Sequence, residues 1–170
     1  MQPERTRVAV IVETSRGHGR QIVAGVSRYA AEHAAWSLRL EPRNIDDRPP
    51  SWLRSWEGDG IIVRCDSLPM AKAVLATGLP VIDVRGGVPE AGLPLVGVEN
   101  EPLADLAFEH FRERGFRHFA WCDLFRLRRS WIDIRRDRFL ERARQAGATS
   151  HRFHSPQPLT RRVHWSHAGT

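Results

Sequence analysis

Polar and charged side chains follow the predicted strands of this chain, at the points where the strands end. They lie at residues 13–16, 64–67, 85–87 and 99–100, and from residue 123 onward. The carboxyl ends of parallel strands meet at one edge of a sheet, where open α/β folds bind their ligands. Carboxylates accept hydrogen bonds and guanidinium groups donate them, so this mixture suits a ligand with several hydroxyl groups. Each single member could instead cap a helix or face solvent.

Nucleotide chemistry has little support in these residues. Gly17 and Gly19 open the first predicted helix, but the dinucleotide fingerprint needs a third glycine where this chain has Ile22. A phosphoacceptor receiver domain needs a lysine after its fifth strand, and the single lysine, Lys72, falls in a predicted helix. We therefore expect no nucleotide and no other cofactor.

Hydrolytic and metal chemistry are also poorly supported. The chain has no G-x-S-x-G elbow, and its histidines cluster near the C-terminus, away from a nucleophile. Two H-x-x-H pairs, in 151–154 and 164–167, could each share a metal, but no further ligand is visible nearby. Cys65 and Cys122 fall at strand ends, where we predict small buried side chains. We expect no metal site and no enzymatic activity.

Length and charge limit the number of domains, the cellular location and the partners that we expect. The 170 residues, 41% of them apolar, suffice for one domain with a core. The longest early apolar run, residues 8–12, is too short for a membrane span, and no signal peptide precedes it, so we expect a cytoplasmic protein. The net charge is +6, and residues 112–162 carry 14 basic and 5 acidic side chains. Nucleic-acid binding by this basic segment is one alternative, although no known reading module accompanies it.

Strand-like and helix-like runs alternate along the chain. Strands are predicted over 8–13, 37–41, 60–64, 80–84, 95–98 and 117–122, and helices over 20–33, 69–77, 101–114 and 135–146, with a helical turn at 51–56. This order predicts an α/β fold, a doubly wound parallel sheet with helices on both faces and a strand order near 2-1-3-4-5.

An ordered series of strings within residues 7–147 resembles one family. The strings lie at 8–26, 56–62, 78–84, 96–100 and 115–120. They resemble the sugar-sensing domain of xylose operon regulators, transcription factors that join a periplasmic-binding-protein-like domain, akin to that of the lac repressor family, to an AraC-type helix-turn-helix domain. The resemblance implies the first lobe of a type 1 periplasmic-binding-protein-like fold.

The resemblance also implies sugar-binding residues. The positions that match the family pattern are Ser15, Arg16, Asp66, Arg85 and Arg135. Arg135 corresponds to the arginine of an R-x-x-G-F pattern, from which this chain departs because Arg138 replaces the glycine; Arg136 is a close rival. Asn100 matches a D-N pair at the start of a helix, and we expect it to act as an N-cap.

The family pattern implies a domain organisation and partners. We expect a first lobe over 1–124, a helix that begins the second lobe over 125–150, and a poorly ordered tail over 151–170. A complete second lobe and the DNA-binding domain are missing, so we expect a truncated regulator. Its expected partners are a xylose-like monosaccharide, DNA only through the missing helix-turn-helix domain, and a second copy in a homodimer.

Two questions stay open at this point. The pair Trp52 and Trp56 could mark a dimer face, or it could simply cover the edge of the sheet. A stand-alone flavodoxin-like nucleotide-binding domain or enzyme is the alternative function, supported by the fold class alone.

Overall fold

The computed structural model describes residues 5–44, 46–123 and 130–154, and it divides the chain into two compact units. Unit 1 is Met1–Gly97 and unit 2 is Val98–Thr170. The division falls earlier than the boundary expected near residue 124. The physical reason is the helix α3 (Asn100–Glu113), whose Phe108 side chain packs within unit 2.

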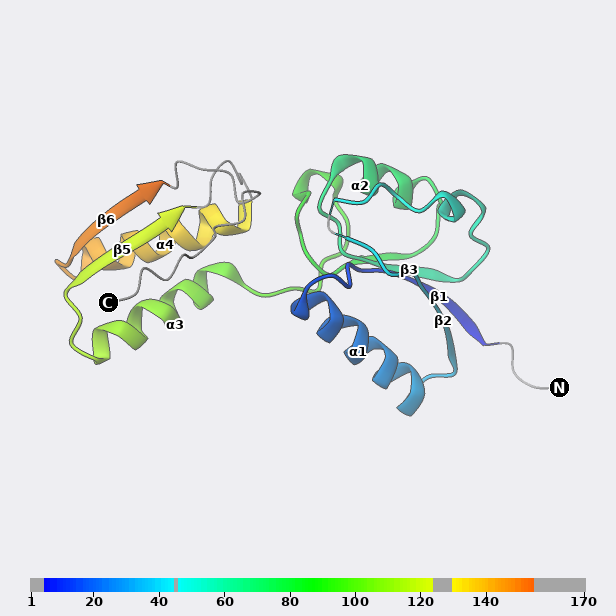
Figure 1. Cartoon of the computed structure of the whole chain (residues 1–170), viewed down its shortest axis with the longest axis horizontal. Helices are drawn as coiled ribbons and strands as arrows, with labels where there is room; N and C mark the ends of the chain where they lie inside the picture. The colour runs from blue at the N-terminus through cyan, green and yellow to red at the C-terminus, as the bar shows by residue number, and fades with distance from the viewer. Residues whose placement is uncertain (1–4, 45, 124–129, 155–170) are drawn as a thin grey trace, which may run out of the picture. The chain divides into compact units, whose positions relative to one another are not determined.

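Unit 1 is a parallel α/β sheet with short helices between its strands. In chain order its elements are β1 (Thr6–Ile11), α1 (Gly17–Glu32), β2 (Trp36–Leu40), η1 (Ser51–Ser55), β3 (Gly60–Val63), α2 (Leu68–Leu75), β4 (Val81–Asp83) and η2 (Pro89–Ala91). The strand order is β2-β1-β3-β4, and every pairing is parallel. Helices α1 and α2 lie on opposite faces of the sheet (Figure 1). The predicted doubly wound α/β fold is confirmed.

The apolar run of the first strand is buried on both faces of the sheet. Val8 and Val10 pack with Val26 of α1 on one face, and Ile11 packs with Val74 of α2 on the other. A strand covered on both sides needs apolar residues at successive positions, which explains the lack of alternation in this segment.

The fifth strand expected over 95–98 is reduced to one parallel bridge between Leu95 and Asp83. Strand β4 ends at Asp83, because the carboxylate of Asp83 accepts backbone N–H groups from Arg85 (2.9 Å) and Gly86 (2.9 Å). Gly86 has a φ of 69°, which favours glycine, so the chain turns away from the sheet immediately. Within the described part of the chain, residues 95–98 therefore make no strand pairing beyond that bridge.

Unit 2 contains a two-stranded parallel sheet with both of its helices on one side (Figure 1). Its elements are α3, β5 (His118–Asp123), α4 (Ser130–Gln145) and β6 (Thr149–His154). The rings of Phe108, Phe119 and Phe139 pack at centroid distances of 5.3–5.9 Å and form the centre of the core.

Strand β6 was not expected, because the tail was predicted to begin at residue 151. Residues 151–154 instead complete β6, which pairs with β5 along its whole length. The sequence of β6 lacks apolar alternation, so the pairing with β5 is the feature that makes it a strand. The rest of the expected tail, including the H-x-x-H pair at 164–167, lies outside the described residues.

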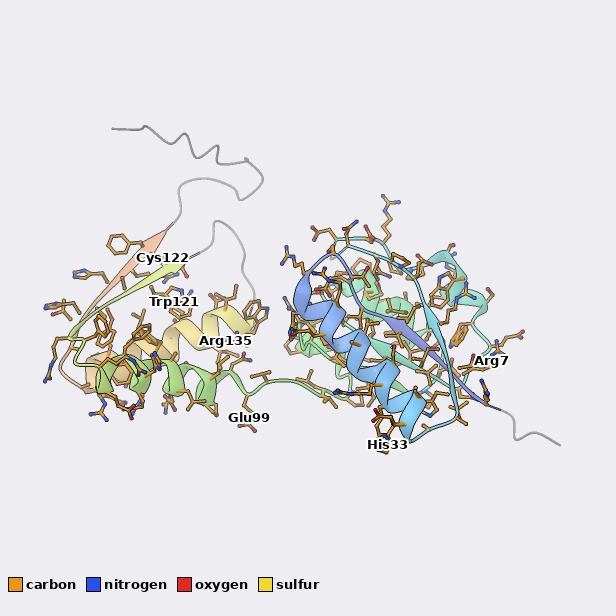
Figure 2. All side chains as sticks on the ribbon, turned by 60° about the horizontal axis from the view of Figure 1, so that its bottom comes forward. Arg7, His33, Glu99, Trp121, Cys122 and Arg135 are labelled. Carbon is orange, nitrogen blue, oxygen red and sulfur yellow. The ribbon has the colours of Figure 1, made fainter. Side chains whose placement is uncertain are left out.

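The two cysteines differ in burial. Cys65 is buried as expected, but Cys122 is exposed, which corrects the prediction for that residue. Cys122 lies on the face of β5 opposite to Phe119, and that face has no helix over it in the described part of the chain (Figure 2). No helix within the described ranges is long and apolar enough to span a membrane.

The aromatic core of unit 2 generates a stability prediction. Phe108 is 1% exposed, so Phe108→Ala should lower the free energy of unfolding by about 3–5 kcal/mol, measured by urea titration. Phe153→Ala, at an exposed position of the same unit, is the matched control and should cost less than about 1 kcal/mol. Equal losses in the two variants would contradict the assigned core.

The thiol of Cys65 should be chemically inert in the folded protein. Burial, with a smaller contribution from the charge of Asp83, raises its pKa to about 11. At pH 8 only about one thiol in a thousand is then the reactive thiolate. Mass spectrometry after brief iodoacetamide treatment should find Cys122 modified and Cys65 unmodified, and both modified in urea. Rapid modification of Cys65 in the native protein would contradict its burial.

Candidate functional site

A chain of alternating charges links the carboxyl ends of the strands of unit 1. Arg64, directly after β3, forms an ion pair with Glu13, which follows β1, and lies 3.6 Å from the carboxylate of Asp66. Asp66 in turn pairs with Arg85 after β4, with Nε and Oδ1 2.9 Å apart. The side chains of Glu13 and Arg64 are 2% and 6% exposed, and Oε2 of Glu13 has no hydrogen-bond partner among the described residues. We call these four residues the strand-end network.

Two further residues hold the strand-end network in place. The carboxylate of Asp83 accepts hydrogen bonds from the backbone N–H groups of Cys65, Arg85 and Gly86, which ties the loop after β3 to the loop after β4. Gly19 of α1 lies against Glu13, and a Cβ atom there would meet the carbonyl oxygen of Glu13 at 1.9 Å. The lack of a side chain at Gly19 therefore leaves room for the buried Glu13.

Arg43 forms the wall of the network on the side of the loop after β2. Its guanidinium donates to the carbonyl oxygens of Asp47 (3.1 Å) and Arg48 (3.2 Å), and its backbone N–H donates to Oγ1 of Thr14 (3.2 Å). Burial lowers the pKa of Arg43. The role of Arg43 could not be predicted from the sequence, because nothing in the loop distinguishes it from an exposed arginine.

The hollow beside the network is small. It is lined by Glu13, Arg43, Asn44, Asp47, Arg64, Asp66, Ser67 and Met70. Its volume of about 10 Å³ has room for about one water molecule. At this edge, unit 1 thus presents a charged face whose hollow is smaller than a monosaccharide needs.

The structure brings together two of the expected sugar contacts in unit 1. Asp66 and Arg85 are half-buried and paired with one another, whereas Ser15 and Arg16 are exposed in the loop between β1 and α1. Arg16 occupies the N-cap position of α1, and its side chain makes no capping hydrogen bond to the described part of the chain. Glu13 and Arg64 belong to the predicted strand-end groups. The sequence feature that indicates their buried pairing is a charged residue directly after an apolar strand.

Arg135 lies near the start of α4 in unit 2 (Figure 2). Its Nε donates to Oδ1 of Asn100 at 2.8 Å, and its guanidinium lies 4.8 Å from the ring centre of Trp131. Burial lowers the pKa of Arg135. The expected N-cap role of Asn100 is wrong: Glu99 is the N-cap residue, and the Asn100 side chain orients Arg135 instead.

The rival, Arg136, is occupied by acidic neighbours. Its Nη1 lies 2.5 Å from Asp133 and 3.6 Å from Asp123, and its Nε lies 2.7 Å from Asp137. The hydrogen bonds that its guanidinium donates to Asp137 and Asp133 raise the pKa of Arg136. Burial alone would raise the pKa of Asp123, but its hydrogen bond from Arg152 and the charge of Arg136 lower it.

Most of the other described arginines of the basic segment are also paired. Arg138 forms two 2.8 Å hydrogen bonds with Asp105, and the remaining pairs are Arg142 with Glu109, Arg112 with Glu109, Arg144 with Glu141 and Arg152 with Asp123. Arginines engaged by carboxylates are poor phosphate ligands, so the structure gives little support to nucleic-acid binding by this surface.

The tryptophan pair of η1 packs onto unit 1. Trp52 and Trp56 contact its core, with ring centroids 5.8 Å apart. The indole N–H of Trp52 donates to Glu41 (2.6 Å), and the guanidinium of Arg39 lies 4.2 Å from the same ring. These contacts favour the interpretation that both tryptophans cover the sheet edge. Across the described ranges, no group of three or more His, Cys, Asp or Glu is placed to hold a metal ion.

The buried pair of the strand-end network makes a testable energetic prediction. Glu13→Leu or Arg64→Met alone should cost about 3–5 kcal/mol of unfolding free energy, because each leaves the other member of the buried ion pair without that partner. The double variant Glu13→Leu/Arg64→Met should recover most of that loss. Urea unfolding measures all three, with the exposed Glu57→Gln as the control. A double variant whose loss equals the sum of the single losses would contradict the pairing.

Residues 7–93 match the family described as the XylR N-terminal domain. The xylose operon regulatory protein of Escherichia coli strain K12 is 27% identical over 132 residues, which cover 73% of this chain and 32% of that protein. The chain thus spans about a third of the length of the curated relatives it matches.

Solved structures agree on the fold. The structure described as the xylose-binding transcription activator XylR has a TM-score of 0.75 at 22% identity. The matched region covers 94% of this chain and 41% of the XylR chain. A periplasmic binding protein/LacI transcriptional regulator from Alkaliphilus metalliredigens, solved with D-xylulofuranose, has a TM-score of 0.61 at 17% identity. The matched region covers 89% of this chain and 57% of the regulator's chain. Because the family match spans half of the residues, the chain belongs to the XylR N-terminal domain family.

Proposed function

We propose that this chain is the sugar-sensing part of a transcription regulator and that its effector is a monosaccharide such as D-xylose. The strand-end network of unit 1 carries the proposal. It places Asp66, an acceptor, and Arg85, a donor, side by side at the sheet edge where ligands of such folds bind. A sugar hydroxyl can donate to one and accept from the other.

The other proposed contacts come from the family pattern. Ser15 and Arg16 lie in the loop that follows Glu13, and Arg135 is the contribution proposed for unit 2. The curated relatives are named xylose operon regulatory proteins, and one similar structure is described as a xylose-binding activator. The proposed role is binding, without catalysis, in a protein of the cytoplasm.

The affinity should be low. The hollow beside the strand-end network holds about one water molecule, so a sugar on this face keeps much of its surface in solvent. Each hydrogen bond that stays exposed to water contributes about 0.5–1.5 kcal/mol or less. A few such bonds correspond to a dissociation constant in the millimolar range or weaker.

The prediction is a saturable, weak response to D-xylose. Titration of the ¹⁵N-labelled chain should shift the amide resonances of the loops after β1, β3 and β4 in NMR spectra, with half-saturation at about 1 mM or above. Arg85→Leu should weaken binding about tenfold or more, because it removes the donor and frees Asp66. Arg54→Leu, at an exposed position of η1, should leave binding unchanged.

Stereochemistry separates a site from general sugar adsorption. L-Xylose offers the same hydroxyls in mirror arrangement, so a site should bind it more weakly than D-xylose. Equal shifts with both enantiomers, or no saturating shift in those loops, would contradict the proposed function. Micromolar binding of D-xylose would contradict the expectation that the bound sugar stays exposed to solvent.

A further inference from the structure

Arg135 differs in its environment from most of the described arginines of unit 2. Most of them pair with a carboxylate. Within the described residues, Arg114, Arg117 and Arg135 form no ion pair, and the first two are exposed, so that water solvates their charge. Arg135 is half-buried, and burial lowers its pKa without an opposing contribution from a carboxylate in the described part of the chain. Its partly desolvated charge is therefore left uncompensated there.

The other segments of unit 2 offer no acidic side chain to neutralise Arg135. Residues 124–129 and 155–170, which lie outside the described ranges, contain no Asp or Glu. Figure 2 shows Glu99, at the N-terminal end of α3, directed away from α4. The counter-charge for Arg135 is therefore expected from a ligand rather than from a side chain of unit 2.

Two uncharged neighbours hold the guanidinium of Arg135. Oδ1 of Asn100 accepts a hydrogen bond from Nε at 2.8 Å, and the central carbon of the guanidinium lies 4.8 Å from the ring centre of Trp131. These contacts orient the group without neutralising it. Among the described residues, Asn100 is the one hydrogen-bond acceptor of Arg135, so the edge formed by Nη1 and Nη2 keeps its donors available.

The Nη1–Nη2 edge of Arg135 matches a carboxylate. Two parallel N–H groups of a guanidinium can bind both oxygens of a carboxylate, and such charge-assisted hydrogen bonds are roughly twice as strong as neutral ones. A hydroxyl group could accept a hydrogen bond from the same edge, but it would leave the positive charge uncompensated. A phosphate monoester carries nearly two negative charges, which exceeds the single unpaired charge of Arg135.

The strand-end network of unit 1 differs from Arg135 in its charge. It contains the two carboxylates of Glu13 and Asp66 and the two guanidinium groups of Arg64 and Arg85. Their charges cancel, so this network suits the uncharged hydroxyl groups of a ligand. Arg135, by contrast, suits an acidic group of the same ligand.

We propose that the effector of this chain is a sugar acid, a polyhydroxy compound whose carboxylate pairs with Nη1 and Nη2 of Arg135. The inference rests on the proposed function, because Arg135 is the contact proposed for unit 2. It specifies the class of the ligand: a uronate or an aldonate binds more tightly than an uncharged compound with the same hydroxyl groups.

Two pairs of probes, each an acid and its amide, test the inference. D-Glucuronate and D-glucuronamide have the same shape and carry the ring hydroxyls of D-xylose, and D-xylonate and D-xylonamide are the open-chain pair. In NMR titrations of the ¹⁵N-labelled whole chain, at least one acid should reach half-saturation at about a tenth of the concentration that its amide needs. The Nε–H resonance of Arg135, identified by its loss in Arg135→Gln, should shift with that acid.

Two substitutions should remove the preference for the acid. Arg135→Gln keeps a hydrogen-bond donor but removes the charge. Asn100→Asp keeps the shape of the side chain but places a carboxylate beside Nε of Arg135, where it competes with the carboxylate of the ligand. In both variants the acid and its amide should bind with nearly equal affinity, and circular dichroism checks that each variant folds.

Arg117→Gln is the matched control for net charge. It removes one positive charge from an exposed position of unit 2, so the preference for the acid should be unchanged. A preference that survives Arg135→Gln would place the carboxylate elsewhere and would overturn the inference. Acetate or inorganic phosphate that shifts the Arg135 resonance at the same concentration as the better acid would also overturn it, because the site would then bind any small anion.

The outcomes distinguish this inference from the proposed function. If D-xylose shifts the loops after β1, β3 and β4 but neither acid binds more tightly than its amide, the sugar acid is wrong and the sugar-sensing function stands. If neither D-xylose nor any of the four probes gives a saturating shift, the proposed function fails and this inference fails with it.

Discussion

The buried pair of Glu13 and Arg64 is the constraint on which the charged edge of unit 1 depends. Two charges in a nearly water-free place stabilise the fold only when each has the other. Arg64 therefore cannot leave Glu13, and its second neighbour, Asp66, is held close to it. Asp66 in turn fixes Arg85. The orientations of Asp66 and Arg85, two of the proposed sugar contacts, thus depend on the buried ion pair of Glu13 and Arg64.

The fold of unit 1 was predictable because its signals are local. A strand buried on both faces shows a continuous apolar run, and glycine ends helices at positive φ, as Gly78 does after α2. Strand β6 was not predictable, because its pairing with β5 is a long-range contact and its own sequence is polar. The missing fifth strand depends on the turn after Asp83, which only the hydrogen bonds of that carboxylate reveal.

The candidate site was predictable as a set of positions but not as a network. Parallel strands bring their ends together, so charged residues after them had to be neighbours. Which of them pair could not be read from the sequence, because Arg64 has two acidic partners within reach. Arg43 was missed because an arginine in a polar loop looks exposed until its hydrogen bonds to Asp47 and Arg48 are seen.

Arginine–carboxylate pairs have different consequences in the two units. In unit 1 the pairs are buried, so losing a partner is costly and the geometry is fixed. In unit 2 the pair of Arg138 and Asp105 is about a third exposed on each side, and such pairs contribute little energy. The aromatic core around Phe108 must therefore supply most of the packing between α3 and α4. Because acidic residues on the flanks of α3 are used for these pairs, its outward face is left with leucine, alanine and phenylalanine, a surface that water solvates poorly.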